Sequence, residues 1–271
     1  MNRIRLFVID PQNDFMDIPG AALPVPGASA DMLHLAGFVD AVGPALDDMV
    51  LTLDSHASVG IERTTFWAAA DGSPVAPFTQ ITAADVRNGR FAPRIEARRE
   101  EVLAYLVALE AAGERTLIVW PVHCVLGTWG HNVHAALATR IAHWEYSTGR
   151  TCDMVLKGRN PMTEQYSAFR AEVPRADDVR SHNNAELMAR LGAGSQVLVV
   201  AGEALSHCVA ASGTDMLTQM DPSRLRNTVF LTDCMSPVEG FEAAGQQFLQ
   251  QLRERGVRTM DSAQAAEALG A

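Results

Sequence analysis

The chain has 271 residues, of which 48% are hydrophobic and 20% charged, a composition typical of a folded globular protein rather than a disordered one. With 32 acidic against 22 basic residues the formal net charge is −10, which disfavours nucleic acid and anionic membrane surfaces as partners. No apolar stretch approaches the about 20 residues that a membrane span needs, and the short apolar run near the N-terminus does not resemble a secretion signal. We therefore expect a cytoplasmic protein.

Short apolar runs alternate with segments of helical periodicity along the chain. The runs predict buried strands over residues 4–9, 49–53, 116–119, 154–156, 196–201 and 228–232. The periodic segments predict helices over residues 31–49, 100–112, 183–191 and 237–255. This alternation is typical of a three-layer, doubly wound α/β fold, with a mostly parallel sheet of about six strands and helices on both faces.

Two segments interrupt the alternation. Residues 16–28 are rich in proline and glycine and predict an ordered loop after the first strand. Residues 57–115 form a long inserted segment, for which we expect a role as a lid or an oligomer contact; a solvated surface decoration is the alternative. No linker divides the rest, so we expect a single domain over residues 1–271.

Chemically active side chains follow the predicted strands. Ligands of open α/β sheets bind beyond the carboxyl ends of the strands, so these positions are the first place to look for a site. The residues found there are Asp10, Asp54, His56, His123, Lys157, Cys208 and Asp233. A single polar residue at a strand end is common by chance, but an acid, a thiol, an amine and candidate metal ligands at one edge favour catalysis.

Lys157 is the only lysine among the 22 basic residues. A compact ammonium group tolerates burial and changes its pKa more readily than a guanidinium, which favours a functional role at this position. The alternative is a chance occurrence.

Cys208 lies at the start of a predicted helix that follows a buried strand. Unpaired backbone N–H groups at a helix start favour a thiolate and can form an oxyanion hole, whereas an inert buried cysteine is the alternative. The adjacent His207 cannot face it, because neighbouring residues on a helix point in different directions. Asp10 is the candidate base, unless it only caps a local turn. All four cysteines lack a C-x-x-C spacing and are expected to be free thiols.

Asp54 and His56 lie two residues apart, so an extended segment would direct both side chains to one face. With His123 they would supply one carboxylate and two imidazoles, a set that suits Zn²⁺, Fe²⁺ or Mn²⁺. Asp-x-His pairs also occur by chance. Glycine-rich nucleotide loops, a P-loop and the serine-hydrolase motif G-x-S-x-G are absent from the sequence.

Several motifs occur in a family-specific order: VIDPQNDF at 8–15, TLDSH at 52–56, WPVHCVLGT at 120–128, KG at 157–158, YSAF at 166–169 and GEALSHCV at 202–209. In this combination the chain resembles the isochorismatase-like cysteine hydrolases, and among them the nicotinamidases. The matching blocks cover most of the chain outside residues 57–115.

The resemblance implies a catalytic triad of Cys208, Asp10 and Lys157 that hydrolyses a small amide, nicotinamide first, through a thioester. It also implies an oxyanion hole made by the backbone N–H groups of Ala204 and Cys208, with a cis peptide bond between Glu203 and Ala204. A homo-oligomer is a further expectation that follows from the family.

For the binding site, the resemblance implies a divalent metal ion, zinc before iron or manganese, held by Asp54, His56 and His123. It implies a substrate pocket lined by Phe15, Trp120 and Tyr166. Many nicotinamidases have one more histidine after the His56 position, whereas this chain has Glu62 nearby, as a fourth ligand or as a partner of a ligand.

Three alternatives remain open from the sequence. The enzyme could act on another small amide or a carbamoyl compound. It could be a metallohydrolase in which the ion activates water and Cys208 only packs. It could also be a catalytically silent relative, against which the intact triad argues.

Overall fold

The computed structural model describes residues 3–113, 116–194 and 196–269. Its central sheet has six strands, all paired in parallel, in the order β10-β9-β8-β1-β2-β7. The strands are β1 (Ile4–Ile9), β2 (Leu46–Asp54), β7 (Asp153–Lys157), β8 (Val197–Gly202), β9 (Thr228–Leu231) and β10 (Arg258–Met260). The predicted parallel sheet is confirmed.

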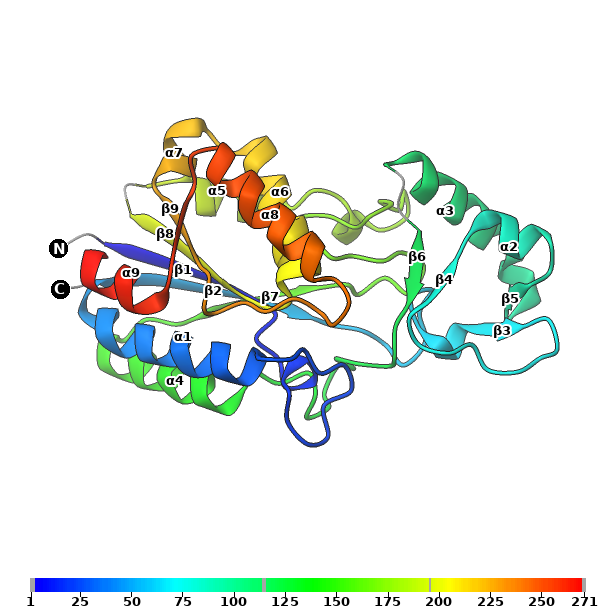
Figure 1. The fold of residues 1–271 in the computed structure, drawn as a ribbon, viewed down its shortest axis with the longest axis horizontal. Helices are drawn as coiled ribbons and strands as arrows, with labels where there is room; N and C mark the ends of the chain where they lie inside the picture. The colour runs from blue at the N-terminus through cyan, green and yellow to red at the C-terminus, as the bar shows by residue number, and fades with distance from the viewer. Residues whose placement is uncertain (1–2, 114–115, 195, 270–271) are drawn as a thin grey trace.

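Helices cover both faces of this sheet, which confirms the predicted three-layer arrangement (Figure 1). One face carries α1 (Ala28–Val42), α4 (Ala135–Thr148) and α9 (Ser262–Leu269); the other carries α5 (Ala185–Gly192), α6 (Ala210–Gln219), α7 (Pro222–Arg226) and α8 (Glu242–Glu254). Within the described ranges, no helix has the length and apolar character that crossing a membrane would require.

Two predicted elements were wrong in detail. Residues 116–119 do not join the central sheet: β6 (Leu117–Val119) pairs antiparallel with β4 (Thr79–Ile81). The sixth central strand is instead β10, which sequence periodicity missed because it is three residues long and only partly buried. The helix predicted to reach residue 49 ends at Val42, because Gly43 and Pro44 break it before β2 begins.

The described part of the inserted segment, residues 57–113, folds together with β6 into a lobe beyond the carboxyl ends of the central strands (Figure 1). Its other elements are β3 (Trp67–Ala69), β5 (Phe91–Pro93), α2 (Ala83–Arg87) and α3 (Arg99–Ala111). The lobe has its own apolar cluster, in which Trp67, Tyr105 and Leu106 are buried. Whether it acts as a lid or an oligomer contact stays a prediction, as does the single-domain organisation.

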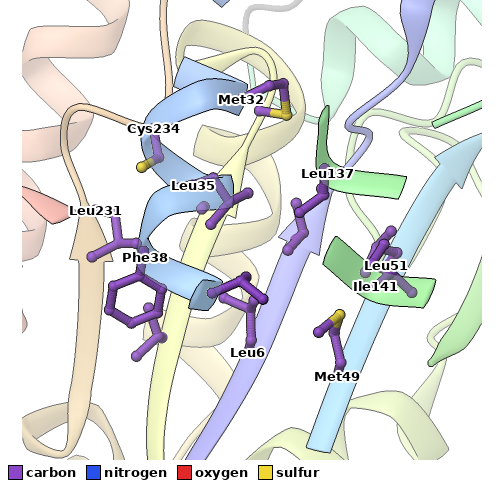
Figure 2. Packing of buried hydrophobic residues seen from close by; sticks show 14 of the residues in the cluster. Leu6, Met32, Leu35, Phe38, Met49, Leu51, Leu137, Ile141, Leu231 and Cys234 are labelled. Carbon is purple, nitrogen blue, oxygen red and sulfur yellow. The ribbon is translucent and has the colours of Figure 1, made fainter. Parts of the chain in front are cut away.

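The main core lies between the central sheet and the helices α1 and α4 (Figure 2). Phe38 and Leu35 of α1 pack there with Leu6 of β1, Leu231 of β9 and Cys234, all of them buried. This packing fixes the strands whose carboxyl ends carry the site.

We expect Phe38→Ala to lower the free energy of unfolding by about 3–5 kcal/mol, because it removes a buried ring and leaves a cavity. Urea denaturation would measure this loss. Leu33→Ala is the matched control: Leu33 lies on the same helix but is 60% exposed, so its change should stay within about 0.5 kcal/mol. Equal losses in the two variants would contradict the assignment of this core.

Candidate active site

The carboxyl ends of four central strands bring together the side chains predicted as the triad. In the register of β2 and β7, Asp54 lies directly beside Lys157. The Lys157 Nζ atom lies 2.9 Å from Asp10 Oδ2, 3.0 Å from Asp54 Oδ1 and 3.5 Å from Cys208 Sγ. All four residues are buried, so an ammonium group, two carboxyl groups and a thiol meet away from bulk water.

Asp10 follows β1 in a left-handed backbone conformation, with φ of 45°. This conformation is strained for a residue other than glycine, and such strain occurs preferentially at functional sites. The Thr52 hydroxyl donates a hydrogen bond of 2.6 Å to Asp10 Oδ1, and the Asp10 N–H donates to the Thr52 carbonyl. Burial raises the pKa of Asp10 despite the nearby Lys157 charge, which suits a group that must accept a proton.

Lys157 is held as a cation. Burial alone would lower the pKa of its amine, but the charges of Asp10 and Asp54 raise it well above the usual value. Its third partner is the Gln165 carbonyl, which accepts a hydrogen bond of 3.2 Å. The ammonium group therefore stays fixed between the two carboxylates and within reach of the Cys208 sulfur.

Cys208 lies in a π-helical turn, Leu205–Val209, that connects β8 to α6. Such turns are rare and are often found at functional sites. Burial raises the pKa of the thiol well above its usual value, opposed by Lys157, so the resting group is a thiol that needs a base. The same turn begins after the Glu203–Ala204 peptide bond, which is cis, as predicted.

Gly202 is required just before this turn. Its φ is 118°, and a Cβ atom there would lie 2.0 Å from the Ile9 carbonyl oxygen. A side chain would therefore push β8 away from β1. The glycine allows Asp10 and Cys208 to follow two strands that lie side by side.

A second buried group consists of Asp54, His56 and His123, whose ligand atoms lie within 4.8 Å of one another. His56 Nε2 is 2.7 Å and His123 Nε2 is 3.5 Å from the same oxygen, Asp54 Oδ2. Burial and the Arg63 charge lower the pKa of His123 to about 4, so this imidazole is neutral, as a metal ligand must be. The three donors fit a divalent metal ion.

Glu62 binds the outer side of this group rather than joining it. Its Oε1 lies 3.3 Å from His56 Nδ1, the ring nitrogen that faces away from Asp54. On the His123 side, the Pro121 carbonyl lies 2.8 Å from Nδ1, and the buried Arg63 guanidinium also contacts that nitrogen. Of the two predicted roles for Glu62, the geometry favours a partner that orients a ligand.

We expect Glu62→Gln to weaken Zn²⁺ binding about 10- to 100-fold, because an amide holds His56 less firmly than a carboxylate does. Competition with a chromogenic chelator would measure the dissociation constant. The matched control is Glu96→Gln, in the lobe but exposed, with its carboxylate near Arg99. Loss of all Zn²⁺ binding in Glu62→Gln would instead indicate a direct ligand.

A small cavity opens above these two groups. Cys208, Asp54 and His123 line it together with Phe15, Trp120 and Tyr166, the three aromatic residues predicted for the substrate pocket. Trp120 Nε1 donates a hydrogen bond of 3.0 Å to the Tyr166 hydroxyl, and Phe15 lies 5.3 Å from the His123 ring. The cavity is thus an apolar slot between the sulfur and the candidate metal ligands.

A larger cavity, of about 300 Å³, lies next to the small one between the lobe and α6. Glu164, Tyr166 and His207 line both cavities. Burial and the nearby Glu62 raise the pKa of Glu164 to about 7. Ligands longer than one ring therefore have room to extend past Tyr166.

Sequence reasoning missed several residues of the site. The Gln12 side chain binds the Asp54 backbone twice. Gln12 Oε1 accepts a hydrogen bond of 2.7 Å from the Asp54 N–H, and Gln12 Nε2 donates one of 2.9 Å to the Asp54 carbonyl. Arg63, Glu164 and Gln165 were also missed. Gln12 could have been found from its place in the motif VIDPQNDF, but for Arg63 the sequence offers no signal. Asp233, at the end of β9, is not part of the site: its carboxylate accepts from Ser262 instead.

No family model matches the chain, and no curated protein sequence matches it either. Solved structures do. A nicotinamidase from Acinetobacter baumanii is 21% identical with a TM-score of 0.64, covering 98% of this chain and 99% of its own. The yeast nicotinamidase is 20% identical, with a TM-score of 0.64 and coverage of 95% and 99%. The pyrazinamidase of Pyrococcus horikoshii, solved with zinc, is 18% identical, with a TM-score of 0.56 and coverage of 96% and 99%.

The chain therefore has the fold of nicotinamidases and isochorismatase-family proteins over its whole length. At these identities the likeness defines the fold, and the chemistry must be argued from the site itself.

Proposed function

We propose that this protein is a cysteine-dependent amidohydrolase that cleaves a small amide to a carboxylate and ammonia, with nicotinamide as the first candidate. The observation that carries the proposal is the contact of Cys208 Sγ with Lys157 Nζ at 3.5 Å, where Asp10 holds the same ammonium group at 2.9 Å. A nucleophile, a base and a fixed cation at the floor of an aromatic-lined cavity are the parts that acyl transfer needs.

In the proposed reaction, Asp10 takes the thiol proton as Cys208 Sγ attacks the amide carbon. The N–H groups of Ala204 and Cys208 stabilise the oxygen of the tetrahedral intermediate, and Lys157 stabilises the charge that develops near the sulfur. The C–N bond then breaks, and the nitrogen leaves as ammonia with the proton from Asp10. Water, deprotonated by Asp10, attacks the thioester, releasing the carboxylate product and restoring the thiol.

Asp54, His56 and His123 would hold a divalent metal ion, with zinc as the first candidate. Two imidazoles and a carboxylate are a usual zinc ligand set that leaves positions open. The Pyrococcus horikoshii pyrazinamidase of the same fold was solved with zinc. When bound, the ion would act as a Lewis acid toward a ring nitrogen of the substrate. Phe15, Trp120 and Tyr166 would flank the ring.

Ammonia release from nicotinamide, measured for the wild type and Cys208→Ala with and without a chelator, tests this proposal. We expect release that requires both the thiol and the metal. Release by Cys208→Ala would support a metallohydrolase in its place. If nicotinamide is not cleaved while iodoacetamide still labels Cys208 rapidly, the cysteine hydrolase stands and its substrate is another amide.

The larger cavity favours one alternative substrate, an amide or carbamoyl compound that is longer than nicotinamide. The larger cavity shares Glu164, Tyr166 and His207 with the small cavity. Such a substrate could therefore place its amide group at Cys208 and the rest of the molecule beside α6. A series of aryl amides of increasing length would separate the two candidates. A cytoplasmic location and a homo-oligomer both stay predictions.

A further inference from the structure

Two buried carboxyl groups lie in contact behind the turn that carries Cys208. Glu203, the residue after β8, is fully buried, and Asp31, in the first turn of α1, is only 7% exposed. Their side chains interact directly. Neither group belongs to the triad or to the candidate metal ligands.

The hydrogen bonds around the pair leave one oxygen on each side without a donor. Glu203 Oε2 accepts from the Ser236 N–H at 3.1 Å, and the Ser236 hydroxyl binds Asp31. Glu203 Oε1 and Asp31 Oδ2 find no donor among the described residues. Two buried carboxyl groups in contact become a donor and an acceptor to each other when one of them carries a proton.

The surroundings indicate which group carries the proton. Asp31 lies at the N-terminal end of α1, where the helix dipole favours a carboxylate, so Glu203 is the protonated partner. Burial, then the Asp31 charge, raises the pKa of Glu203 well above its usual value. The other titratable groups that face the pair are Asp17, His34, Asp233 and Cys234.

This pair is tied to the backbone next to Cys208. The Glu203 N–H donates to the Ile9 carbonyl at 2.8 Å, and the Leu205 N–H donates to the Ser236 carbonyl at 2.9 Å. Ser236 therefore binds the Glu203 side chain through its N–H and the following turn through its carbonyl. Between these anchors lies Ala204, whose N–H belongs to the proposed oxyanion hole.

We propose that Glu203 is a positioning residue: it shares one proton with Asp31, and the singly protonated pair fixes the backbone that presents the Ala204 N–H to the reacting carbonyl. This inference rests on the proposed function. Loss of the shared proton would place two negative charges in one buried site and loosen the turn.

Folding stability tests the shared proton without any assay of activity. The folded protein holds a proton on Glu203, whereas the unfolded chain releases this proton once the pH exceeds the ordinary pKa of a glutamate. The free energy of unfolding of the wild type should therefore fall as the pH rises above that value. Glu203→Gln donates from its amide to Asp31 and should lack this loss. We expect the ratio of the unfolding equilibrium constants, wild type over Glu203→Gln, to rise with pH above about pH 5, at up to about tenfold per pH unit.

Asp17→Asn is the control, since it removes an exposed carboxylate that lies near the pair but shares no proton with it. Hydrogen bonds from Ser29 lower the pKa of Asp17 to about 2, so this group stays ionised and its ratio to the wild type should stay flat. A flat ratio for Glu203→Gln as well would overturn the shared proton.

Kinetics test the positioning role. For an amide that the wild type hydrolyses, we expect Glu203→Ala to lower kcat about 10- to 100-fold with little change in KM, and Glu203→Gln to restore it. Alkylation of Cys208 by iodoacetamide, which needs no oxyanion hole, should keep its rate in both variants. Unchanged kcat in Glu203→Ala would overturn the role, whereas absence of hydrolysis in the wild type would count against the proposed function alone.

Discussion

Cys208→Ala is expected to lower kcat of amide hydrolysis by at least about 10⁴-fold, because removal of the nucleophile closes the thioester route and leaves only binding and the oxyanion hole. The sulfur that it removes is the one that lies 3.5 Å from Lys157 Nζ and lines the small cavity. Ammonia release under saturating substrate would measure the loss. The fold and the metal site should stay intact, since the sulfur is not among the candidate metal ligands.

Cys152→Ala is the matched control for this variant. Cys152 is also a free thiol but is only partly buried, just before β7, and its N–H binds Glu145. Its replacement should leave kcat unchanged. Retention of wild-type activity in Cys208→Ala, with zinc still required, would replace the thiol mechanism by water activation at the metal.

Lys157→Met is expected to abolish measurable hydrolysis and to destabilise the protein by about 3–5 kcal/mol, because it leaves Asp10 and Asp54 buried without their cation. Urea denaturation would measure the second effect independently of the first. The loss should be smaller at low pH, where Asp10 can take up a proton, since its pKa is already raised by burial.

Lys157→Arg separates charge from shape. Arginine keeps the positive charge and should recover part of the lost stability, but its planar fork cannot occupy the position of a compact ammonium between Asp10, Asp54 and Cys208. We therefore expect its activity to stay at least about 100-fold below the wild type. Wild-type activity in this variant would mean that only the charge matters.

The strand ends were the informative part of the sequence. An apolar run followed by Asp10 or Asp54 identifies both a buried strand and the residue at its carboxyl end, so the meeting of these side chains could be predicted from the parallel sheet. The run before Lys157 also identifies a strand, but the prediction that it is buried was wrong, because β7 lies at the edge of the sheet with Met154 and Leu156 exposed. The rule failed for β6, because an apolar run also suits a short antiparallel strand in the lobe. It missed β10, whose residues Arg258, Thr259 and Met260 form no apolar run.

Contacts between distant segments could not be predicted. Glu62 was expected near the metal ligands from the resemblance to nicotinamidases, but only the structure distinguishes the outer nitrogen of His56 from the inner one. Arg63 reaches His123 across the base of the lobe. Asp31 and Glu203 come from a helix and a strand end that no local pattern connects.

Lys157 also makes the chain an unusual substrate for amine chemistry. Among these 271 residues no other side chain carries an aliphatic amine, and this one is 1% exposed. Reagents that acylate lysine should leave the folded protein's side chains unmodified. Modification of Lys157 would then require the site to open, so its acylation rate would report how often the carboxyl ends of β7 and β2 become accessible to solvent.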